Sequence, residues 1–190
     1  MPTHVALLRG INLGGRNKVA MADLREVVAS LGHTDVATYI QSGNVVFNTE
    51  QSDTAALAAA LEKAIAAAVG VEARVVVVSR DELAQVVRDN PYSGEPNPRA
   101  VHAVFLSATP GPEVAENVAA ATRRADQKQP GHRDTARVIG RTIFLHTPDG
   151  FGRSELASQI IQGSRGRSAD VAGTARNWAT VTKLMTMCDA

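Results

Sequence analysis

The spacing of apolar residues in the first half of the chain predicts the order strand, helix, strand, strand, helix, strand. Apolar residues recur every three or four positions in 21–31 and in an alanine-rich stretch that ends at Gly70, as in amphipathic helices. Ser52 or Asp53 is a suitable N-cap for the second helix. Short runs rich in β-branched residues predict strands at 4–9, 36–40, 44–48 and 73–79.

The second half shows a similar order of elements, without a residue-level repeat. Apolar runs predict strands at 101–106, 135–139 and 142–146. Helices are expected at 81–89, from Gly111 to about Arg124, from Ser154 to Gly163, and from near Thr174 onward. We therefore predict an α/β (α+β) fold of two ferredoxin-like βαββαβ halves packed together, with a C-terminal helix.

A segment rich in proline separates the two halves. The sequence NPYSGEPNP at 90–98 holds three prolines and one glycine, which interrupt regular structure. We therefore expect a first ferredoxin-like half at 1–90, a linker at 91–98, and a second half with the C-terminal helix at 99–190.

The composition is that of a soluble globular protein. Of the 190 residues, 44% are hydrophobic and 21% are charged, so a buried core is expected and intrinsic disorder is not. No apolar run approaches the roughly 18 residues of a membrane span, and the first residues lack the features of a signal peptide. We expect a cytoplasmic protein with no membrane partner. The single cysteine, Cys188, excludes internal disulfides and thiolate zinc clusters.

Charge is unevenly distributed, although the formal net charge is only +1. Residues 1–20 hold three basic side chains and no acid, and residues 123–183 hold eleven basic side chains against five acids. Residues 50–122 hold ten acids against five basic side chains. If the basic ends meet in the fold, they would favour a phosphate-bearing ligand or nucleic acid. Scattered, solvated charge is the alternative.

The segment LLRGINLGGRNKV (7–19) is the first candidate site. Its glycines tolerate positive φ and let a ligand approach the backbone, and its position between a strand and a helix is typical of phosphate-binding loops. The spacing matches neither GxGxxG nor a P-loop, so neither nucleotide motif is supported. A simple turn between strand and helix is the alternative. The candidate ligand-binding residues are Arg9, Gly10, Asn12, Gly14, Gly15, Arg16, Asn17 and Lys18.

GTARNWATVTKL (173–184) is the second candidate site. Thr174 is a good N-cap, and a free helix N-terminus beside Arg176 and Asn177 would hold an anion. Ordinary capping is the alternative. The helical spacing of Trp178 with later apolar residues indicates a buried, structural side chain.

We expect the loop 10–18 and the helix start near Thr174 to face one anion site. Asp149 and Asp170 are the local acids for the alternative, a set of structural ion pairs without a ligand. Weaker candidates are Ser42 and Asn44, which a hairpin turn also explains, and Arg153, which precedes the N-cap Ser154.

The search for catalytic motifs is negative. The five histidines show neither HxxxH nor HExxH spacing, no GxSxG elbow is present, and Cys188 lies close to the C-terminus. We therefore assign no catalytic residue, expect no metal and no cofactor, and leave open an enzyme whose groups converge only in three dimensions.

Four stretches together resemble one family. LLRGINLGGRNKVAMADLR, TYIQSGNVVF, GRSEL and TARNWATVTKL resemble domain-of-unknown-function family 1697, over nearly the whole chain. The resemblance implies a compact bacterial α/β protein with ferredoxin-like halves and no established activity. Ala20 and Glu155 stand where the family often has proline and lysine, which weakens a positive contribution near Ser154. The recurring polar segments of the family fall here on Arg9, Gly10, Asn12, Gly15, Asn17, Lys18, Ser42, Gly43, Asn44, Gly152, Arg153, Ser154, Thr174, Arg176, Asn177 and Trp178.

Three functions are compatible with these patterns. The first is a module with a basic, glycine-lined site that binds a phosphate-bearing small molecule or nucleic acid, favoured by the basic ends of the chain. The second is an enzyme that acts on a phosphorylated or nucleotide-like small molecule. The third is a protein–protein interaction module. With only 4% aromatic residues, broad base-stacking surfaces are not expected.

Overall fold

The computed structural model describes residues 1–164 and 171–190. Its strands are β1 (His4–Arg9), β2 (Thr34–Tyr39), β3 (Asn44–Asn48), β4 (Arg74–Ser79), β5 (Val101–Leu106), β6 (Thr135–Ile139), β7 (Thr142–His146) and β8 (Gly173–Asn177). Its helices are α1 (Met21–Ser30), α2 (Thr54–Val69), α3 (Arg80–Asp89), α4 (Pro112–Lys128), α5 (Glu155–Gly163) and α6 (Trp178–Cys188), with a short 3-10 helix, η1 (Phe151–Arg153). The chain divides into two compact units. The first holds residues 1–85 and 183–190, and the second holds residues 86–182.

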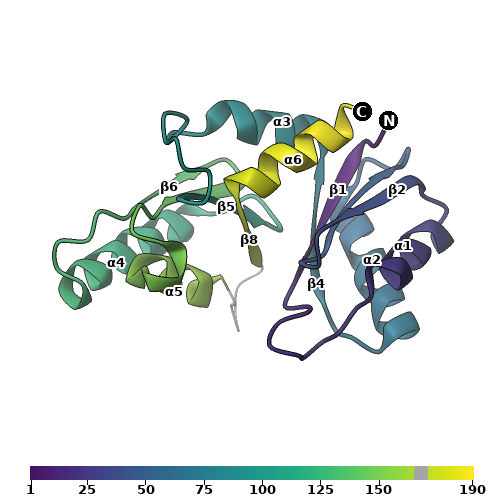
Figure 1. Cartoon of the computed structure of the whole chain (residues 1–190), viewed down its shortest axis with the longest axis horizontal. Coiled ribbons are helices and arrows are strands. Elements are labelled where there is room, and N and C mark those ends of the chain that lie inside the picture. The colour runs from purple at the N-terminus through teal and green to yellow at the C-terminus, as the bar shows by residue number, and fades with distance from the viewer. Residues whose placement is uncertain (165–170) are drawn as a thin grey trace. The chain divides into compact units, whose positions relative to one another are not determined.

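The first unit is built on an antiparallel sheet of four strands. The strand order is β2-β3-β1-β4, with α1 following β1 and α2 following β3, which is the ferredoxin-like βαββαβ arrangement (Figure 1). Both helices pack on one face of the sheet, around a core that includes Leu8, Leu24, Phe47, Leu61 and Val77. Asp53 caps α2 by accepting from two backbone N–H groups, as its sequence position predicts.

The second unit repeats this topology. Its sheet has the order β6-β7-β5-β8, and α4 and α5 pack on one face (Figure 1). The core between sheet and helices includes Val104, Leu106, Ala125, Leu145 and Leu156. The predicted fold class is therefore confirmed, because each unit holds one βαββαβ motif.

Both sheets are also buried on the face that α1, α2, α4 and α5 leave free. Val5, Leu7 and Val78 in the first sheet, and Ala103 and Phe105 in the second, are each at most 4% exposed. Burial on both faces explains why the central strands read as continuous apolar runs rather than as alternating patterns.

The beginning of the C-terminal helix differs from the prediction. Residues 173–177 form β8, which pairs antiparallel with β5, and α6 begins at Trp178. Thr174 is thus a strand residue, and Asn177 is the cap, because its Oδ1 accepts from the N–H of Thr180 over 2.9 Å. Pairing with the free edge of β5 satisfies the backbone of this segment and completes the four-stranded sheet, and it outweighs a weak local helix pattern.

The end of the chain belongs to the first of the two compact units. Residues 183–190 group with residues 1–85, and the Arg80 guanidinium forms an ion pair with Asp189 over 2.5 Å. The domain boundaries expected from the sequence, 1–90, 91–98 and 99–190, stay a prediction. No helix within residues 1–164 and 171–190 is both long and apolar enough to cross a bilayer.

We predict that Trp178→Ala destabilises the protein by about 3 kcal/mol, the lower end of the range for large aromatic truncations. The indole is half-buried and lies against Phe144, with the ring centroids 6.3 Å apart. Urea unfolding checks the prediction, with the exposed Thr182→Ala on the same helix as a control expected to change stability by about 0.5 kcal/mol or less. Equal stability of Trp178→Ala and the wild type would contradict a structural role for the ring.

Candidate anion-binding loop

The loop between β1 and α1 has a tight turn at its tip. Gly14 and Gly15 have φ values of 56° and 79°, and the N–H of Arg16 donates to the carbonyl of Leu13 over 3.0 Å. Two consecutive positive φ values are typical of a type I′ turn, in which glycine carries no Cβ penalty. An ideal Cβ at either glycine would have no atom within 4 Å, so the backbone at the tip is openly accessible.

Asn12 holds the base of this loop together. Its Nδ2 donates to the carbonyls of Val19 and Gln41, and its Oδ1 accepts from the N–H of Val19, all over 2.9 Å. The residue has a φ of 53°, which asparagine tolerates better than most side chains. Both amide hydrogens of Asn12 are therefore used inside the protein.

Asn17 makes a second closing contact. Its Nδ2 donates to the carbonyl of Gly10, and its own carbonyl accepts from the N–H of Asn12. The structure thus gives both asparagines an internal role that the sequence pattern does not indicate. Their expected role as ligand-binding amides stays a prediction.

The turn 40–44 lies against the base of the loop. The carbonyl of Gly43 accepts from the N–H of Leu8, and an ideal Cβ at Gly43 would lie 2.7 Å from Leu8 Cβ and 2.8 Å from Ile11 Cδ1. Only glycine fits this close approach. Asn44 is fully buried, and its Nδ2 donates to Ser42 Oγ and to the end of β2. Ser42 and Asn44 therefore shape the turn that supports the loop.

Two cations flank the glycine tip. Arg16 and Lys18 are exposed, and neither forms an ion pair with a carboxylate in the described part of the chain. Arg9 is half-buried at the end of β1, in register with Arg74 of β4. Arg16 and Lys18 are thus placed to meet a solvent-borne anion.

The helix that follows the loop begins without a side-chain cap. Ala20 occupies the N-cap position and has no oxygen with which to accept from the first-turn N–H groups of α1. The partial positive charge of this helix end follows directly after Lys18. Asp23, in the first turn of α1, carries a negative charge that opposes the partial positive charge of this helix end.

The other predicted site residues lie in the second unit. Arg153 is exposed in η1, and Ser154 caps α5 by accepting from the N–H of Ala157 over 2.9 Å. Arg176 is buried in β8, where its Nη1 donates to Thr174 Oγ1 and to a backbone carbonyl, both over 2.8 Å. Burial lowers the pKa of Arg176 to about 10, which still leaves it charged at neutral pH.

The expected shared site joins residues of different units. The loop 10–18 belongs to the first unit, and Thr174, Arg176 and Asn177 belong to the second, so the shared site stays a prediction. Of the two acids expected nearby, Asp149 forms an ion pair with Arg133, and Asp170 lies outside the described residues.

A histidine–carboxylate pair in the second unit has no signal in the sequence. His146 Nε2 lies 2.6 Å from a carboxylate oxygen of Glu95, and the ring of Tyr92 stacks on the imidazole. The backbone N–H of Asn97 and, to a lesser degree, His146 lower the pKa of Glu95. The partners are separated by 51 residues, so no local motif could have revealed them.

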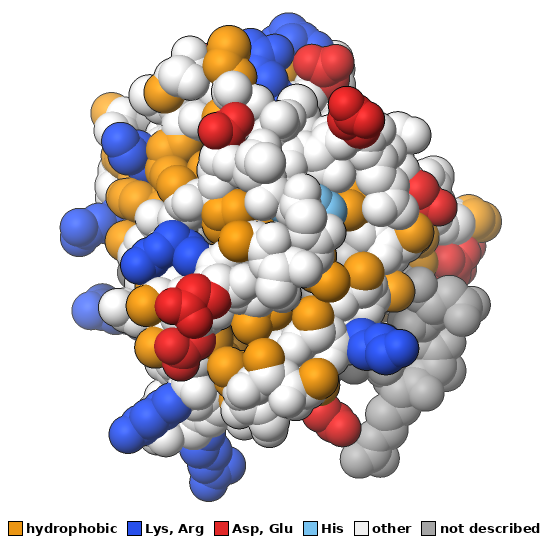
Figure 2. Space-filling view, turned by 90° about the vertical axis from the view of Figure 1, so that its right-hand side faces the viewer, with side chains coloured by type: hydrophobic (Ala, Val, Ile, Leu, Met, Phe, Trp, Pro, Cys, Tyr) orange, Lys and Arg blue, Asp and Glu red, His pale blue; other side chains and the backbone are white. Residues whose placement is uncertain are grey.

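The surface does not show one continuous basic region on the face seen in Figure 2. Lys and Arg side chains there are interspersed with acidic and apolar ones. No group of three or more His, Cys, Asp or Glu is placed to hold a metal within residues 1–164 and 171–190. This face therefore gives no support for a broad polyanion-binding surface.

Comparison with known proteins gives a family and a fold. A family model described as "Protein of unknown function (DUF1697)" matches residues 1–135. The structure is similar to that of conserved bacterial protein SP0830 from Streptococcus pneumoniae, with a TM-score of 0.69, 23% identity, and coverage of 98% of both chains. No curated protein matches the chain. The structural similarity extends beyond the family-model match, and at this identity it establishes the fold alone.

We predict that Asn12→Ala lowers the free energy of unfolding by about 1–3 kcal/mol, because it removes three hydrogen bonds and leaves the N–H of Val19, in the buried part of the loop, without its acceptor. Asn17→Ala removes one hydrogen bond and should cost less. Urea unfolding gives the two values, and hydrogen exchange at Val19 reports the loop directly. Unchanged exchange at Val19 in Asn12→Ala would contradict this role.

Proposed function

The chain belongs to the DUF1697 family, whose function is unknown, and for this member we propose that the loop 10–18 binds a phosphate group of a small anionic ligand. The observation that carries the proposal is the glycine tip between Leu13 and Arg16. The N–H groups of Gly14 and Gly15 donate to no described residue, and their surroundings are open. Successive N–H groups in such turns form concave anion sites.

The electrostatics of the loop favour an anion over a cation. Arg16 and Lys18 supply two positive charges, and the start of α1 adds a partial positive charge. Without a counterion the two cations repel each other, by about 1 kcal/mol if they approach to 4 Å in water. A hydrogen bond to a charged group contributes about 1.5–3 kcal/mol, so a bound phosphate more than offsets this repulsion and the charge of Asp23.

Binding is better supported than catalysis at this loop. Residues 10–19 contain no histidine, cysteine, aspartate or glutamate, so the loop itself offers no general acid or base near neutral pH. Its base is held by hydrogen bonds within the protein, which favours a preformed site. The proposed activity is therefore recognition of a phosphate-bearing molecule. A cytoplasmic location stays a prediction.

We predict that Arg16→Gln and Lys18→Gln each weaken binding of inorganic pyrophosphate about tenfold, measured by isothermal titration calorimetry. The matched control is Lys63→Gln, which removes an exposed positive charge from α2 in the same unit. This control should bind pyrophosphate as the wild type does. An equal loss in all three variants would show a general charge effect and contradict the loop site.

Nucleic acid is a separate outcome of the same comparison. If a single-stranded oligonucleotide binds more tightly than pyrophosphate, with an affinity that falls steeply with salt, the ligand is a polyanion. If pyrophosphate binds and the oligonucleotide shows no advantage, the ligand is a small phosphate compound. If neither pyrophosphate nor the oligonucleotide binds, the proposal is refuted.

A further inference from the structure

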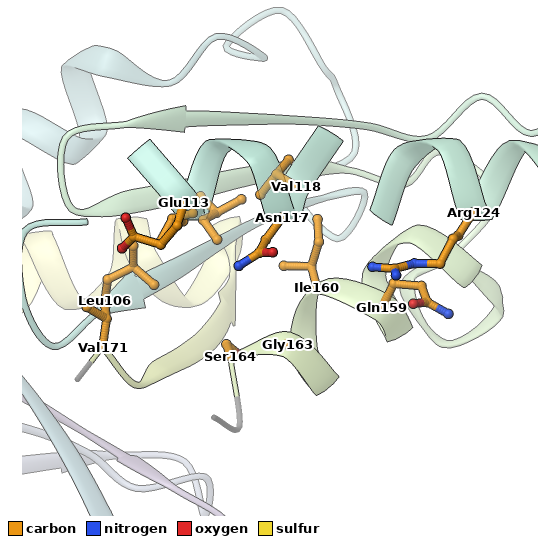
Figure 3. A pocket seen from close by; sticks show the side chains of 12 residues that line it. Leu106, Glu113, Asn117, Val118, Arg124, Gln159, Ile160, Gly163, Ser164 and Val171 are labelled. Atoms are coloured by element: carbon orange, nitrogen blue, oxygen red, sulfur yellow. The ribbon is translucent and has the colours of Figure 1, made fainter. Parts of the chain in front are cut away.

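A groove runs between α4 and α5 in the second unit, and no predicted site residue lines it. Its volume is about 500 Å³, within the range of roughly 300–1,000 Å³ typical of small-molecule sites. Figure 3 shows its walls, which come from α4 on one side and the C-terminal half of α5 on the other. The end of β5 contributes Leu106 to the same groove.

The floor of the groove is apolar. Leu106, Val118, Ile143 and Ile160 line it, and each is at most 8% exposed in the folded protein. These residues belong to the core cluster between the helices and the second sheet. An apolar group in the groove would therefore contact the edge of the core and lose contact with water.

The rim of the groove is polar, and its one cation among the described lining residues is Arg124. Asn117 points into the groove from α4 (Figure 3). The Arg124 guanidinium lies beside Gln159, at one end of the groove. The side chains of Asn117 and Arg124 have no hydrogen-bonding or ion-pair partner among the described residues. The nearby Lys128, in contrast, pairs with Glu155. Arg124 is thus available to an anionic group at this end.

Among the described lining residues Glu113 is the one acid, and it is distant from Arg124. Glu113 lies eleven positions earlier on α4, an axial separation of roughly 16 Å, which exceeds the Debye length of about 8 Å at physiological ionic strength. Its carboxylate folds back over the N-terminus of α4, where an ideal Cβ on Gly111 would overlap it. Repulsion from Glu113 therefore does not cancel the attraction of Arg124.

We infer that this groove binds a small amphipathic acid, with a hydrocarbon chain or ring on the apolar floor and a carboxylate on Arg124. Asn117, seven positions before Arg124 on the same helix, offers its amide to a polar group elsewhere on the ligand. An apolar body with one anionic end satisfies the floor and the rim together. A purely apolar ligand would gain nothing from Arg124, and a highly charged ligand would gain nothing from the floor.

The experiment uses the fluorescent probe 8-anilinonaphthalene-1-sulfonate, which has an apolar ring system and one negative charge. The wild type should bind it with a saturable rise in fluorescence, and decanoate should displace it at least tenfold more effectively than decanol. Arg124→Gln should weaken binding of the probe about tenfold. Arg123→Gln is the matched control, because this neighbouring arginine on the same helix does not line the groove.

Gly163 allows the groove itself to be blocked. It ends α5 without a positive φ, lines the groove, and has no atom within 4 Å of an ideal Cβ, so a larger side chain would enter the open space. Gly163→Leu should abolish saturable binding, whereas Gly163→Ala should retain it. The inference is overturned if Gly163→Leu binds as the wild type does, if Arg124→Gln and Arg123→Gln behave alike, or if the wild type does not bind the probe. Arg16→Gln should leave this binding unchanged, which separates the groove from the proposed phosphate loop.

Discussion

The loop after β1 depends on the three hydrogen bonds of the Asn12 side chain. They join the beginning of the loop to Val19 at its end and to the backbone of Gln41 in the neighbouring turn. Because both amide hydrogens bond inside the protein, the loop is closed before any ligand arrives. The exposed Gly14–Gly15 tip and the cations beside it then need little further ordering to meet an anion, which is the main advantage of a preorganised site.

Much of the fold could be predicted from residue patterns. The central strands contain unbroken apolar runs, such as 5–8 in β1 and 103–106 in β5, and the glycines at 14, 15 and 43 stand where the backbone has positive φ. The missed element, β8, has no such signal, because its Thr174–Arg176 stretch is polar and stands directly before a helix. It becomes a strand because β5 offers an unpaired edge, and this is a property of the tertiary structure.

The candidate sites were less predictable than the fold. The glycines and cations of the loop are recognisable in the sequence, whereas the hydrogen bonds by which Asn12 and Asn17 close the loop are not. The groove between α4 and α5 was not predicted, because Asn117, Arg124 and Ile160 share no motif and are brought together by helix packing. Local patterns reveal backbone requirements, whereas side-chain convergence over long sequence separations needs the folded structure.

The most direct test of the preformed phosphate site is a titration of ¹⁵N-labelled protein with inorganic pyrophosphate, followed by amide chemical shifts. The account predicts that the Gly14 and Gly15 amides shift most, that they saturate together, and that the buried, hydrogen-bonded Val19 amide exchanges slowly throughout. Shifts centred elsewhere, with the Gly14 and Gly15 amides unmoved at saturation, would contradict it.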